Sequence, residues 1–520
     1  MKKHPSEKRI QKWIELLARK GKLHQAIAET HEMKSLFSAD YEKKHAPEFS
    51  VDYLIRKKTV KAAQCVLAAL ENVIVVSATK NISKTPGERL LPDLVLLNKA
   101  ENAIVLVEIK RSEKTERETV TELLGYEQEI RNQLPFIADA SLYLLVVSVD
   151  FSGLLDHALS NLIVWGKREI LALRVNYSGS KWKLVVHFPS AWEDLRYDGL
   201  PSDVITTADI HIDHKRGTDK ISSPEQLVQL LKKEKKHILD AVQALVRDLE
   251  SARSSGFVIA WQDMVDKKSD WGLTIGIVDP FRLLGQANQS RTGKSQTPIN
   301  KTIDLLPEGS RTSLDAIRAL TKRALTALQS HGDIRFSKVL SWDDRRKRLM
   351  GRALPIEVDF WGTLAEHVRE YTTNPMIRER VIPEMDAYGL SWRSPTIGIS
   401  LLHQITRNSV FVRGNIGASG LFQLGELLGY SLLICRNFGI LSPKEKLIAT
   451  ASLRWLGFEC VAAFREIIFR YTTASDIEQE PPRLQIPMDV DPVSSEKSLN
   501  DFVRWILEHF IGEKQPVHGR

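Results

Sequence analysis

The part of this chain that most limits its possible folds is a pair of apolar segments whose ends carry charged residues. Residues 103–109 are nearly all apolar, a pattern typical of a central strand that is covered on both faces. Glu108 and Lys110 lie two positions apart at the end of this segment. Because side chains alternate across a strand, these two groups project from the same face. A carboxylate and an ammonium at the end of a buried strand need a partner or a function.

A third charged residue, Asp93, comes directly before the second apolar segment, residues 94–97. The short connection at residues 98–102 predicts a turn that returns one strand beside the other, so Asp93, Glu108 and Lys110 are expected to converge. Carboxylate oxygens are ligands that Mg²⁺ and Mn²⁺ prefer, and a neighbouring lysine can orient or activate a water and stabilise the charge of a phosphate. The alternative is a solvated Glu108–Lys110 ion pair without a catalytic role.

The segments around this pair predict the element order α-β-β-β-α-β-α-β. The expected elements are a helix at 51–72, strands at 73–76, 94–97 and 103–109, a helix at 115–133, a strand at 142–149, a helix at 154–165 and a strand at 170–175. The apolar strands are expected to form a rigid sheet that holds the charged groups in place.

The pair Pro92-Asp93, followed by Glu108-Ile109-Lys110, resembles the signature of the PD-(D/E)XK nuclease superfamily. The element order matches the core of that superfamily over about a quarter of the chain. The resemblance implies an α/β N-terminal domain with a restriction-endonuclease-like αβββαβ core. It also implies that Asp93, Glu108 and the Ile109 backbone carbonyl bind Mg²⁺ (or Mn²⁺), while Lys110 positions the attacking water.

Two further features extend the resemblance. RecB-like and NucS-like members often carry Gln-x-x-x-Tyr on the helix after the catalytic strand, and this chain has Glu122 and Tyr126 at that spacing, which places them on one helix face. The glutamate in place of glutamine leaves three roles open for Glu122: a metal ligand, a hydrogen-bond acceptor, or part of a solvated helix face. Many members also supply an acid from the first helix, for which Glu71 is the candidate and Glu88 the alternative.

Composition agrees with a nucleic-acid enzyme without requiring one. The 520 residues are 43% hydrophobic and carry a net charge of +8, so two or three domains with sizeable cores are expected. Residues 1–60 hold 14 Lys and Arg against 8 Asp and Glu. Such a segment either tracks a phosphate backbone or forms the solvated face of a helix. The candidate nucleic-acid contacts are Lys8, Arg9, Lys12 and Arg111, with Trp13 among the basic residues.

The cysteines and the N-terminus predict a cytoplasmic protein. Cys65, Cys435 and Cys460 are too few and too far apart for a disulfide framework or a zinc module. The N-terminus lacks the apolar core of a signal peptide. The longest apolar stretch, residues 416–435, contains Glu426 and predicts a buried helix rather than a membrane span.

The second half of the chain is less informative. It predicts a helix at 224–251, strands at 256–261 and 273–278, and then a long polar run. The expected organisation is a basic helical N-terminal segment, the nuclease-like domain, an α+β middle region, a linker, and a mixed, mainly α-helical C-terminal domain for recognition or partner binding. These correspond to residues 1–50, 51–200, 201–285, 286–311 and 312–520.

Two polar clusters in this half have competing interpretations. His211, Asp213 and His214 have metal-ligand chemistry, but a polar loop rich in aspartate contains such trios by accident. The basic run at residues 343–348 is either a nucleic-acid contact or the solvated start of a helix.

The favoured hypothesis is a metal-dependent DNA endonuclease, and its resemblance to fused nucleases suggests prokaryotic anti-phage or restriction-type defence. The expected partner is DNA, with a partner protein or a second copy engaged through the C-terminal region, and no membrane. The alternative is an inactive nuclease-fold protein that binds nucleic acid or acts as a scaffold. A third hypothesis places the main activity after residue 312, as a nucleotide-driven or ligand-sensing protein.

Overall fold

The fold comes from a computed structural model, and contacts divide the chain into two compact units that are described separately. Unit 1 contains residues 1–46 and 50–196, and unit 2 contains residues 47–49 and 197–520. The structure describes residues 5–28, 51–111, 113–138, 141–178, 181–190, 200–214, 224–263, 269–283, 314–329, 332–350, 352–373, 391–406 and 437–442, and single residues at 30, 33, 298, 378, 385, 389, 446, 449, 452, 455 and 456.

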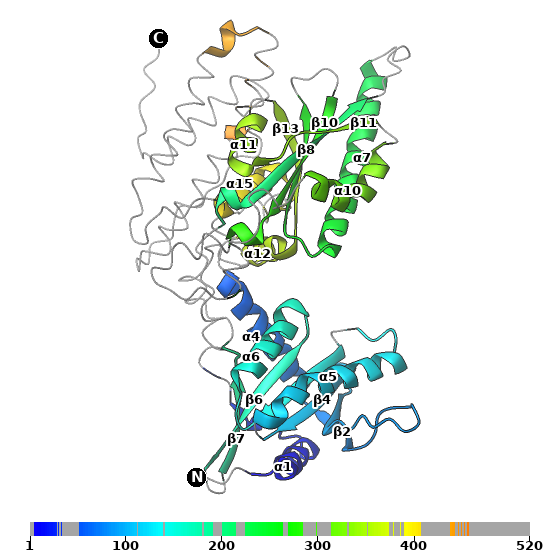
Figure 1. Ribbon diagram of the computed structural model, residues 1–520, viewed down its shortest axis with the longest axis vertical. Coiled ribbons are helices and arrows are strands. Elements are labelled where there is room, and N and C mark those ends of the chain that lie inside the picture. The colour runs from blue at the N-terminus through cyan, green and yellow to red at the C-terminus, as the bar shows by residue number, and fades with distance from the viewer. Residues whose placement is uncertain are drawn as a thin grey trace, which may run out of the picture. The chain divides into compact units, whose positions relative to one another are not determined.

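The described residues of unit 1 form a seven-stranded mixed sheet in the order β1-β7-β6-β5-β4-β3-β2 (Figure 1). The strands are β1 (Ile27–Ala28), β2 (Val73–Ala78), β3 (Leu94–Asn98), β4 (Ala103–Lys110), β5 (Leu142–Ser148), β6 (Ile170–Ser178) and β7 (Lys181–His187). The helices are α1 (Glu7–Arg19), α4 (Val51–Ala69), α5 (Glu113–Gln133) and α6 (Gly153–Ser160). Strands β2, β3 and β4 are antiparallel neighbours, whereas β4, β5 and β6 are parallel.

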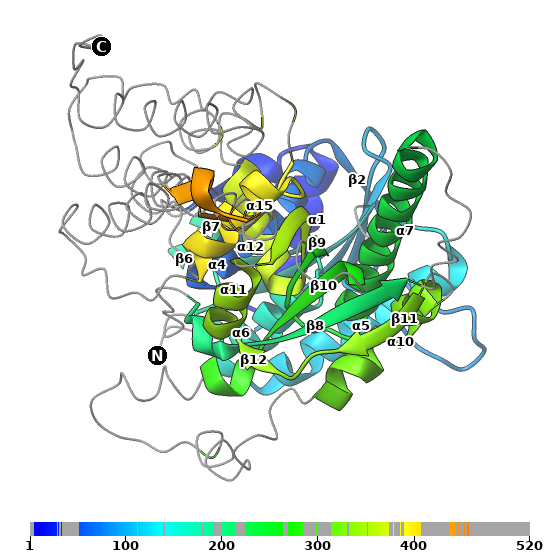
Figure 2. The same cartoon turned by 90° about the horizontal axis from the view of Figure 1, so that it is seen from above.

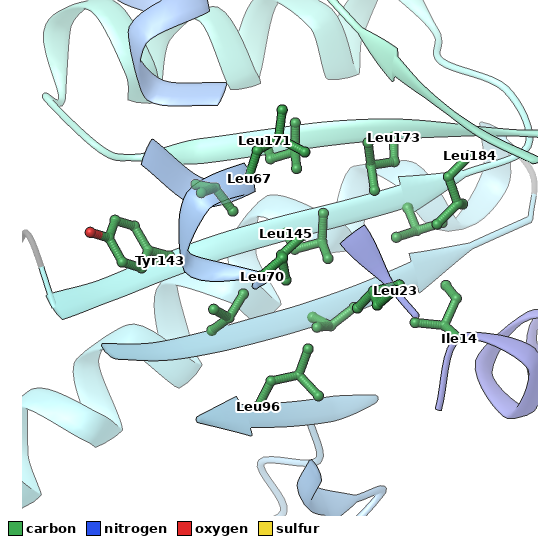
Figure 3. Close-up of a cluster of buried hydrophobic side chains, with 14 of the residues drawn as sticks. Ile14, Leu23, Leu67, Leu70, Leu96, Tyr143, Leu145, Leu171, Leu173 and Leu184 are labelled. Carbon is green, nitrogen blue, oxygen red and sulfur yellow. The ribbon is translucent and has the colours of Figure 1, made fainter. Parts of the chain in front are cut away.

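Helices cover both faces of this sheet, and strand β4 shows how the sequence divides between them. Val105 and Val107 belong to the apolar cluster that α1 and α4 complete on one face (Figure 3). Leu106, between them, belongs to the cluster that α5 and α6 complete on the other face. A strand buried on both faces needs apolar residues at successive positions, which explains the continuous apolar run.

The order α4-β2-β3-β4-α5-β5-α6-β6 is the order expected from the sequence, and the expectation of an α/β fold is confirmed. Several boundaries differ by a few residues, and α4 ends at Ala69 instead of residue 72. The helix expected at 154–165 is α6 followed by a π-helical turn, Asn161–Trp165. Asn72 adopts the left-handed conformation (φ 54°). The Asn98 side-chain amide donates hydrogen bonds to the carbonyls of Ala69 (3.1 Å) and Glu71 (2.9 Å). These bonds satisfy carbonyls at the helix end and let the chain turn into β2.

The described residues of unit 2 form a six-stranded sheet in the order β11-β8-β10-β9-β13, with β12 also paired to β8. The strands are β8 (Ile205–His214), β9 (Gly256–Asp263), β10 (Ser269–Val278), β11 (Gly332–Phe336), β12 (Leu340–Ser341) and β13 (Ala353–Trp361). The helices are α7 (Pro224–Ser251), α10 (Leu314–Gln329), α11 (Trp342–Met350), α12 (Gly362–Thr373) and α15 (Pro395–Ile405). Helices α7 and α10 share an apolar cluster with one face of the sheet (Figure 2). Helix α11 lies on the opposite face, where the Trp342 ring meets the Phe257 ring edge-on.

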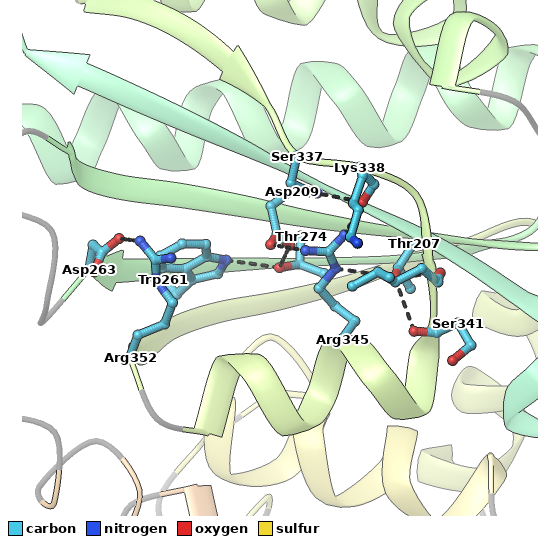
Figure 4. A network of polar contacts seen from close by, with 11 residues as sticks. Thr207, Asp209, Trp261, Asp263, Thr274, Ser337, Lys338, Ser341, Arg345 and Arg352 are labelled. Carbon is cyan, nitrogen blue, oxygen red and sulfur yellow. Dashed lines mark hydrogen bonds and ion pairs between the residues drawn. The ribbon is translucent and has the colours of Figure 1, made fainter.

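A buried polar network connects α11 to this second face (Figure 4). The Arg345 guanidinium donates hydrogen bonds to the Asp209 carboxylate, to Thr207 Oγ1 (3.3 Å) and to the Lys338 carbonyl (2.5 Å). The Thr274 hydroxyl donates to the other oxygen of Asp209 (2.7 Å), and the Trp261 indole N–H donates to the Thr274 hydroxyl (2.9 Å). Only 2% of Arg345 and 5% of Asp209 are exposed, so this is an ion pair held inside the unit.

Unit 2 corrects three expectations from the sequence. Strands on both sides of residues 286–311 share one sheet, so this segment does not separate two folded domains. The trio His211, Asp213 and His214 lies on strand β8 and not in a loop. The basic run does begin a helix, α11, but Arg345 within it is buried and not solvated.

Among the described residues, no helix combines the length and apolar character needed to cross a membrane. The apolar stretch at residues 416–435 lies outside the described residues.

Candidate active site

Strand register brings Asp93 and Glu108 side by side at one end of the unit 1 sheet. Leu94 pairs with Val107 in the antiparallel β3–β4 ladder. Asp93, which precedes Leu94, and Glu108, which follows Val107, therefore lie opposite each other at the same end of the two strands. Asp93 shares the face of Val95, which belongs to the cluster on the α5 side. Glu108 is on the same side, because it shares the face of Leu106. The two carboxylates therefore meet beneath helix α5.

Lys110 completes this group and is held by two carboxylates. Its ammonium lies 2.8 Å from Glu108 Oε1 and donates a hydrogen bond to Glu122 Oε2 at 2.6 Å. Glu108 and Lys110 are 4% and 7% exposed, so the pair is shielded from solvent. The backbone N–H of Ile109 donates to Asp93 Oδ2 at 2.7 Å, which fixes the aspartate against β4. The Glu108–Lys110 pair is therefore buried, and not the solvated ion pair that was the alternative.

Helix α5 supplies the other two residues that the sequence indicated. Glu122 and Tyr126 lie one turn apart, as their spacing requires. Glu122 accepts a hydrogen bond from Lys110, which is one of the three roles left open for it. Tyr126 is 5% exposed and packs with the apolar residues between α5 and the sheet. Burial, followed by the negative charges of Glu108 and Glu122, raises the pKa of the Tyr126 hydroxyl, so Tyr126 stays protonated at neutral pH.

The carboxylates are poised to accept a positive charge. Burial raises the pKa of Asp93 to about 6, although the hydrogen bond from Ile109 and the positive charge of Lys110 both lower it. Burial and then the charge of Asp93 raise the pKa of Glu108 as well. Burial alone would lower the pKa of Lys110, but its bonds to Glu108 and Glu122 raise it above the ordinary lysine value. Lys110 is therefore a permanent cation and a hydrogen-bond donor at neutral pH, not a base.

Helix α1 brings residues to the site that the sequence did not indicate. The Glu7 carboxylate accepts a hydrogen bond from the backbone N–H of Arg111 (3.0 Å), directly after the Glu-x-Lys segment, and its charge acts on Asp93. The Gln11 side chain donates to the Asp93 carbonyl (2.7 Å) and to the Thr79 hydroxyl (2.6 Å). The only sequence pattern that could have pointed to them is their spacing: Glu7 and Gln11 are four residues apart and flank the apolar stripe of an amphipathic helix. That signal does not say which strand end the helix meets.

The expectation that Glu71 supplies a metal ligand is wrong in this structure. The Glu71 carbonyl is bonded by Asn98, which lies at the opposite end of β3 from Asp93. Five strand residues span about 17 Å, too far for a shared metal ion. The Glu71 side chain is 60% exposed and faces His24 at 3.7 Å. The alternative, Glu88, accepts a hydrogen bond from the Ser83 hydroxyl in the exposed loop before β3. The acid that a helix before β2 does bring to this strand end is Glu7 of α1, which accepts the hydrogen bond of the Arg111 backbone N–H.

The four candidate nucleic-acid contacts are all exposed, but they divide among three places. Arg111 follows the Glu-x-Lys segment and lies at the site. Lys8 and Lys12 lie on the outer face of α1. Arg9 instead stacks on Trp182 of β7, with 5.3 Å between the guanidinium carbon and the ring centroid.

The donor set at this site suits a hard divalent cation. Glu108 Oε2 is buried and lacks a hydrogen-bond partner, although it lies beside Lys110 and Asp93. Among the described residues, no group of three or more His, Cys, Asp or Glu side chains is placed to hold a metal ion. Mg²⁺ does not require such a group, because it commonly binds through one or two carboxylates and keeps several waters. Asp93, Glu108 and the Ile109 carbonyl fit that pattern.

Comparison with protein-family models finds no match for this chain, and no curated protein or solved structure matches it.

Proposed function

We propose that this chain is a metal-dependent nuclease that hydrolyses phosphodiester bonds of DNA. We further propose that its residues 51–200 form a PD-(D/E)XK, restriction-endonuclease-like domain. The observation that supports this most directly is the group at the end of β3 and β4: Asp93 beside Glu108, with Lys110 held 2.8 Å from Glu108 under helix α5. The element order of unit 1 and the positions of Glu122 and Tyr126 support the same proposal.

The residues divide the chemistry as follows. Asp93, Glu108 and the Ile109 carbonyl would hold Mg²⁺ or Mn²⁺. A bound cation would supply a Lewis acid for the scissile phosphate and lower the pKa of a coordinated water. Lys110, kept protonated by Glu108 and Glu122, would donate a hydrogen bond to the attacking water or to a phosphate oxygen. Glu122 is a positioning residue, because it acts through Lys110.

A carboxylate-rich site with one buried ammonium also supports the proposed need for a metal ion. Without a cation, the negative charges of Glu7, Asp93, Glu108 and Glu122 oppose one another, which contributes to the raised pKa of Asp93 and Glu108. A phosphate would meet the same repulsion. Binding of a divalent cation would compensate this charge and let the phosphate approach.

The test uses the purified full-length chain with supercoiled plasmid, linear duplex DNA, single-stranded DNA and RNA, each with Mg²⁺, Mn²⁺ or EDTA. Asp93→Asn, Glu108→Gln and Lys110→Met should each remove most of the metal-dependent cleavage. Glu71→Gln is the matched control, because Glu71 is an acid of the same unit at the opposite end of β3. It should cleave like the unchanged chain.

Mn²⁺ titration by calorimetry separates metal binding from catalysis. Asp93→Asn and Glu108→Gln should weaken Mn²⁺ binding, whereas Glu71→Gln should not. Cleavage that survives in both carboxylate variants would overturn the assignment of the site. Nucleic-acid binding without cleavage under every condition would favour the alternative, an inactive nuclease-fold binding or scaffold protein. A role in prokaryotic anti-phage or restriction-type defence is part of the proposal and would be tested by phage challenge of cells that express the chain or its Asp93→Asn variant.

A further inference from the structure

A second feature of unit 1 lies at the edge of the sheet formed by β1 and β7, away from the carboxylate group. Helix α1, the segment around β1 and the β6–β7 hairpin surround an open hollow of about 980 Å³. Its lining includes three aromatic residues, two cationic residues and two side-chain amides: Trp13, Tyr177, Trp182, Arg9, Lys183, Gln25 and Asn176. None of the described residues that line it is acidic.

The aromatic residues form one continuous surface. Tyr177 and Trp182 are directly paired across β6 and β7, so their side chains lie next to each other on the same face of the hairpin. The Trp13 ring meets the Trp182 ring at 5.1 Å and 64°, an edge-to-face contact. All three side chains are only partly buried against the core, so aromatic surface remains open to the hollow.

The polar residues surround this aromatic surface with groups that suit a nucleotide. Arg9 lies over Trp182 from the helix side, and Lys183 is exposed on β7 one residue after Trp182. Asn176 pairs with Lys183 across the hairpin, so both side chains start from the face opposite Tyr177 and Trp182 and line the hollow only at its edge. Gln25 is an exposed residue of the lining. Flat aromatic faces accept stacked bases, cations bind phosphates, and amides can read a base edge.

We propose that this hollow binds a single strand of nucleic acid, with one base stacked on Trp182 and Tyr177 and the adjoining phosphates on Arg9 and Lys183. A duplex does not satisfy the site, because its bases are stacked on each other and only an unpaired base offers a free face to Trp182. The inference deepens the proposed nuclease function, since it names an unpaired strand as part of the substrate. It concerns binding and does not require cleavage.

The test measures binding of fluorescein-labelled 12-nucleotide single-stranded DNA to the full-length chain by anisotropy, in EDTA so that no cleavage occurs. Loss of one stacked base corresponds to about 5-fold to 150-fold weaker binding, and Trp182→Ala should fall in this range. Trp182→Phe should recover part of the loss, because phenylalanine keeps a stacking face. Arg9→Gln and Lys183→Gln should each weaken binding and reduce the slope of log affinity against log salt by about 1.

Trp165 provides a matched control, because it is a 59% exposed tryptophan of the same unit with Lys58 over its ring at 6.0 Å. Trp165→Ala should bind like the unchanged chain. Far-ultraviolet circular dichroism and thermal melting check that Trp182→Ala is folded, and the exposed Arg9→Gln and Lys183→Gln variants test the site independently of the core.

Two results would overturn the inference: unchanged single-strand binding in Trp182→Ala, Arg9→Gln and Lys183→Gln, or an equal loss for single strands and duplex in Trp182→Ala. The first result combined with metal-dependent cleavage would leave the proposed nuclease intact and remove only this site. Trp182-dependent binding in a chain that never cleaves would support this site and count against the nuclease.

Discussion

Replacement of Arg345 by methionine should destabilise unit 2 by about 3–5 kcal/mol, the cost typical of breaking a buried ion pair from one side. Arg345 donates hydrogen bonds to three acceptors, Asp209, Thr207 and the Lys338 carbonyl. At about 1–1.5 kcal/mol for each bond, these contacts alone account for roughly 3–4.5 kcal/mol. Burial lowers the pKa of Arg345, and the charge of Asp209 opposes that shift. Methionine fills a similar volume but leaves the Asp209 carboxylate buried without that cation.

Urea unfolding followed by tryptophan fluorescence measures this loss, because Trp261 belongs to the same network. Arg348→Met is the control on the same helix, since Arg348 is exposed and its replacement should change stability by at most about 0.5 kcal/mol. The double variant Asp209→Leu, Arg345→Met should recover most of the lost stability, because apolar residues can replace a buried pair at little cost. A loss below about 1 kcal/mol in Arg345→Met, or a double variant as unstable as the single one, would refute this account of the network.

Three further outcomes are expected. Burial lowers the pKa of His367 to about 4. The unfolded chain takes up this proton near pH 6.5, before the folded chain does, so the stability of unit 2 should fall by roughly 2 kcal/mol between pH 7.5 and pH 5. In His367→Leu, the urea midpoint should depend less on pH over this range. Asn98→Ala removes both bonds to the end of α4 and should lower the stability of unit 1 by about 2 kcal/mol in thermal unfolding, with exposed Asn176→Ala as the control. Glu7→Gln removes a negative charge that raises the pKa of Asp93, so the acid limb of the cleavage pH profile should move to lower pH.

The sequence predicted unit 1 well because its signals are local. A continuous apolar run such as residues 103–109 is required of a strand with two buried faces, and the short turn before it fixes which strand lies beside it. Those two facts were enough to place Asp93 next to Glu108. The position of Lys110 then followed from the two-residue repeat of a strand. The prediction that Glu71 is a metal ligand was wrong because the end of helix α4 meets β3 at the end opposite Asp93. No local sequence pattern shows at which end of the strand the helix packs.

Unit 2 was harder to predict because its important contacts join distant residues. Strand β8 alternates apolar residues with Thr207, Asp209 and His211, which resembles a polar loop or a half-exposed strand. Helix α11 covers the polar side, and Arg345, 136 residues away, supplies the charge that Asp209 needs. A basic residue in a run of basic residues carries no local sign of burial. Its partner becomes visible only when the strand and the helix have packed together.

Helix α1 explains how one short segment can serve both proposed sites. Its apolar stripe, formed by Ile10, Ile14 and Ala18, is buried in the sheet core. On one flank of that stripe, Glu7 and Gln11 bond to the backbone around Asp93; on the other flank, Arg9 and Trp13 border the aromatic hollow. Residues four apart share a helix side, so this division follows directly from the sequence once the stripe is docked. The basic N-terminal helix is therefore more than a solvated face. Its Arg9 stacks on Trp182, and its Gln11 holds the backbone carbonyl of Asp93, the residue proposed to bind the metal.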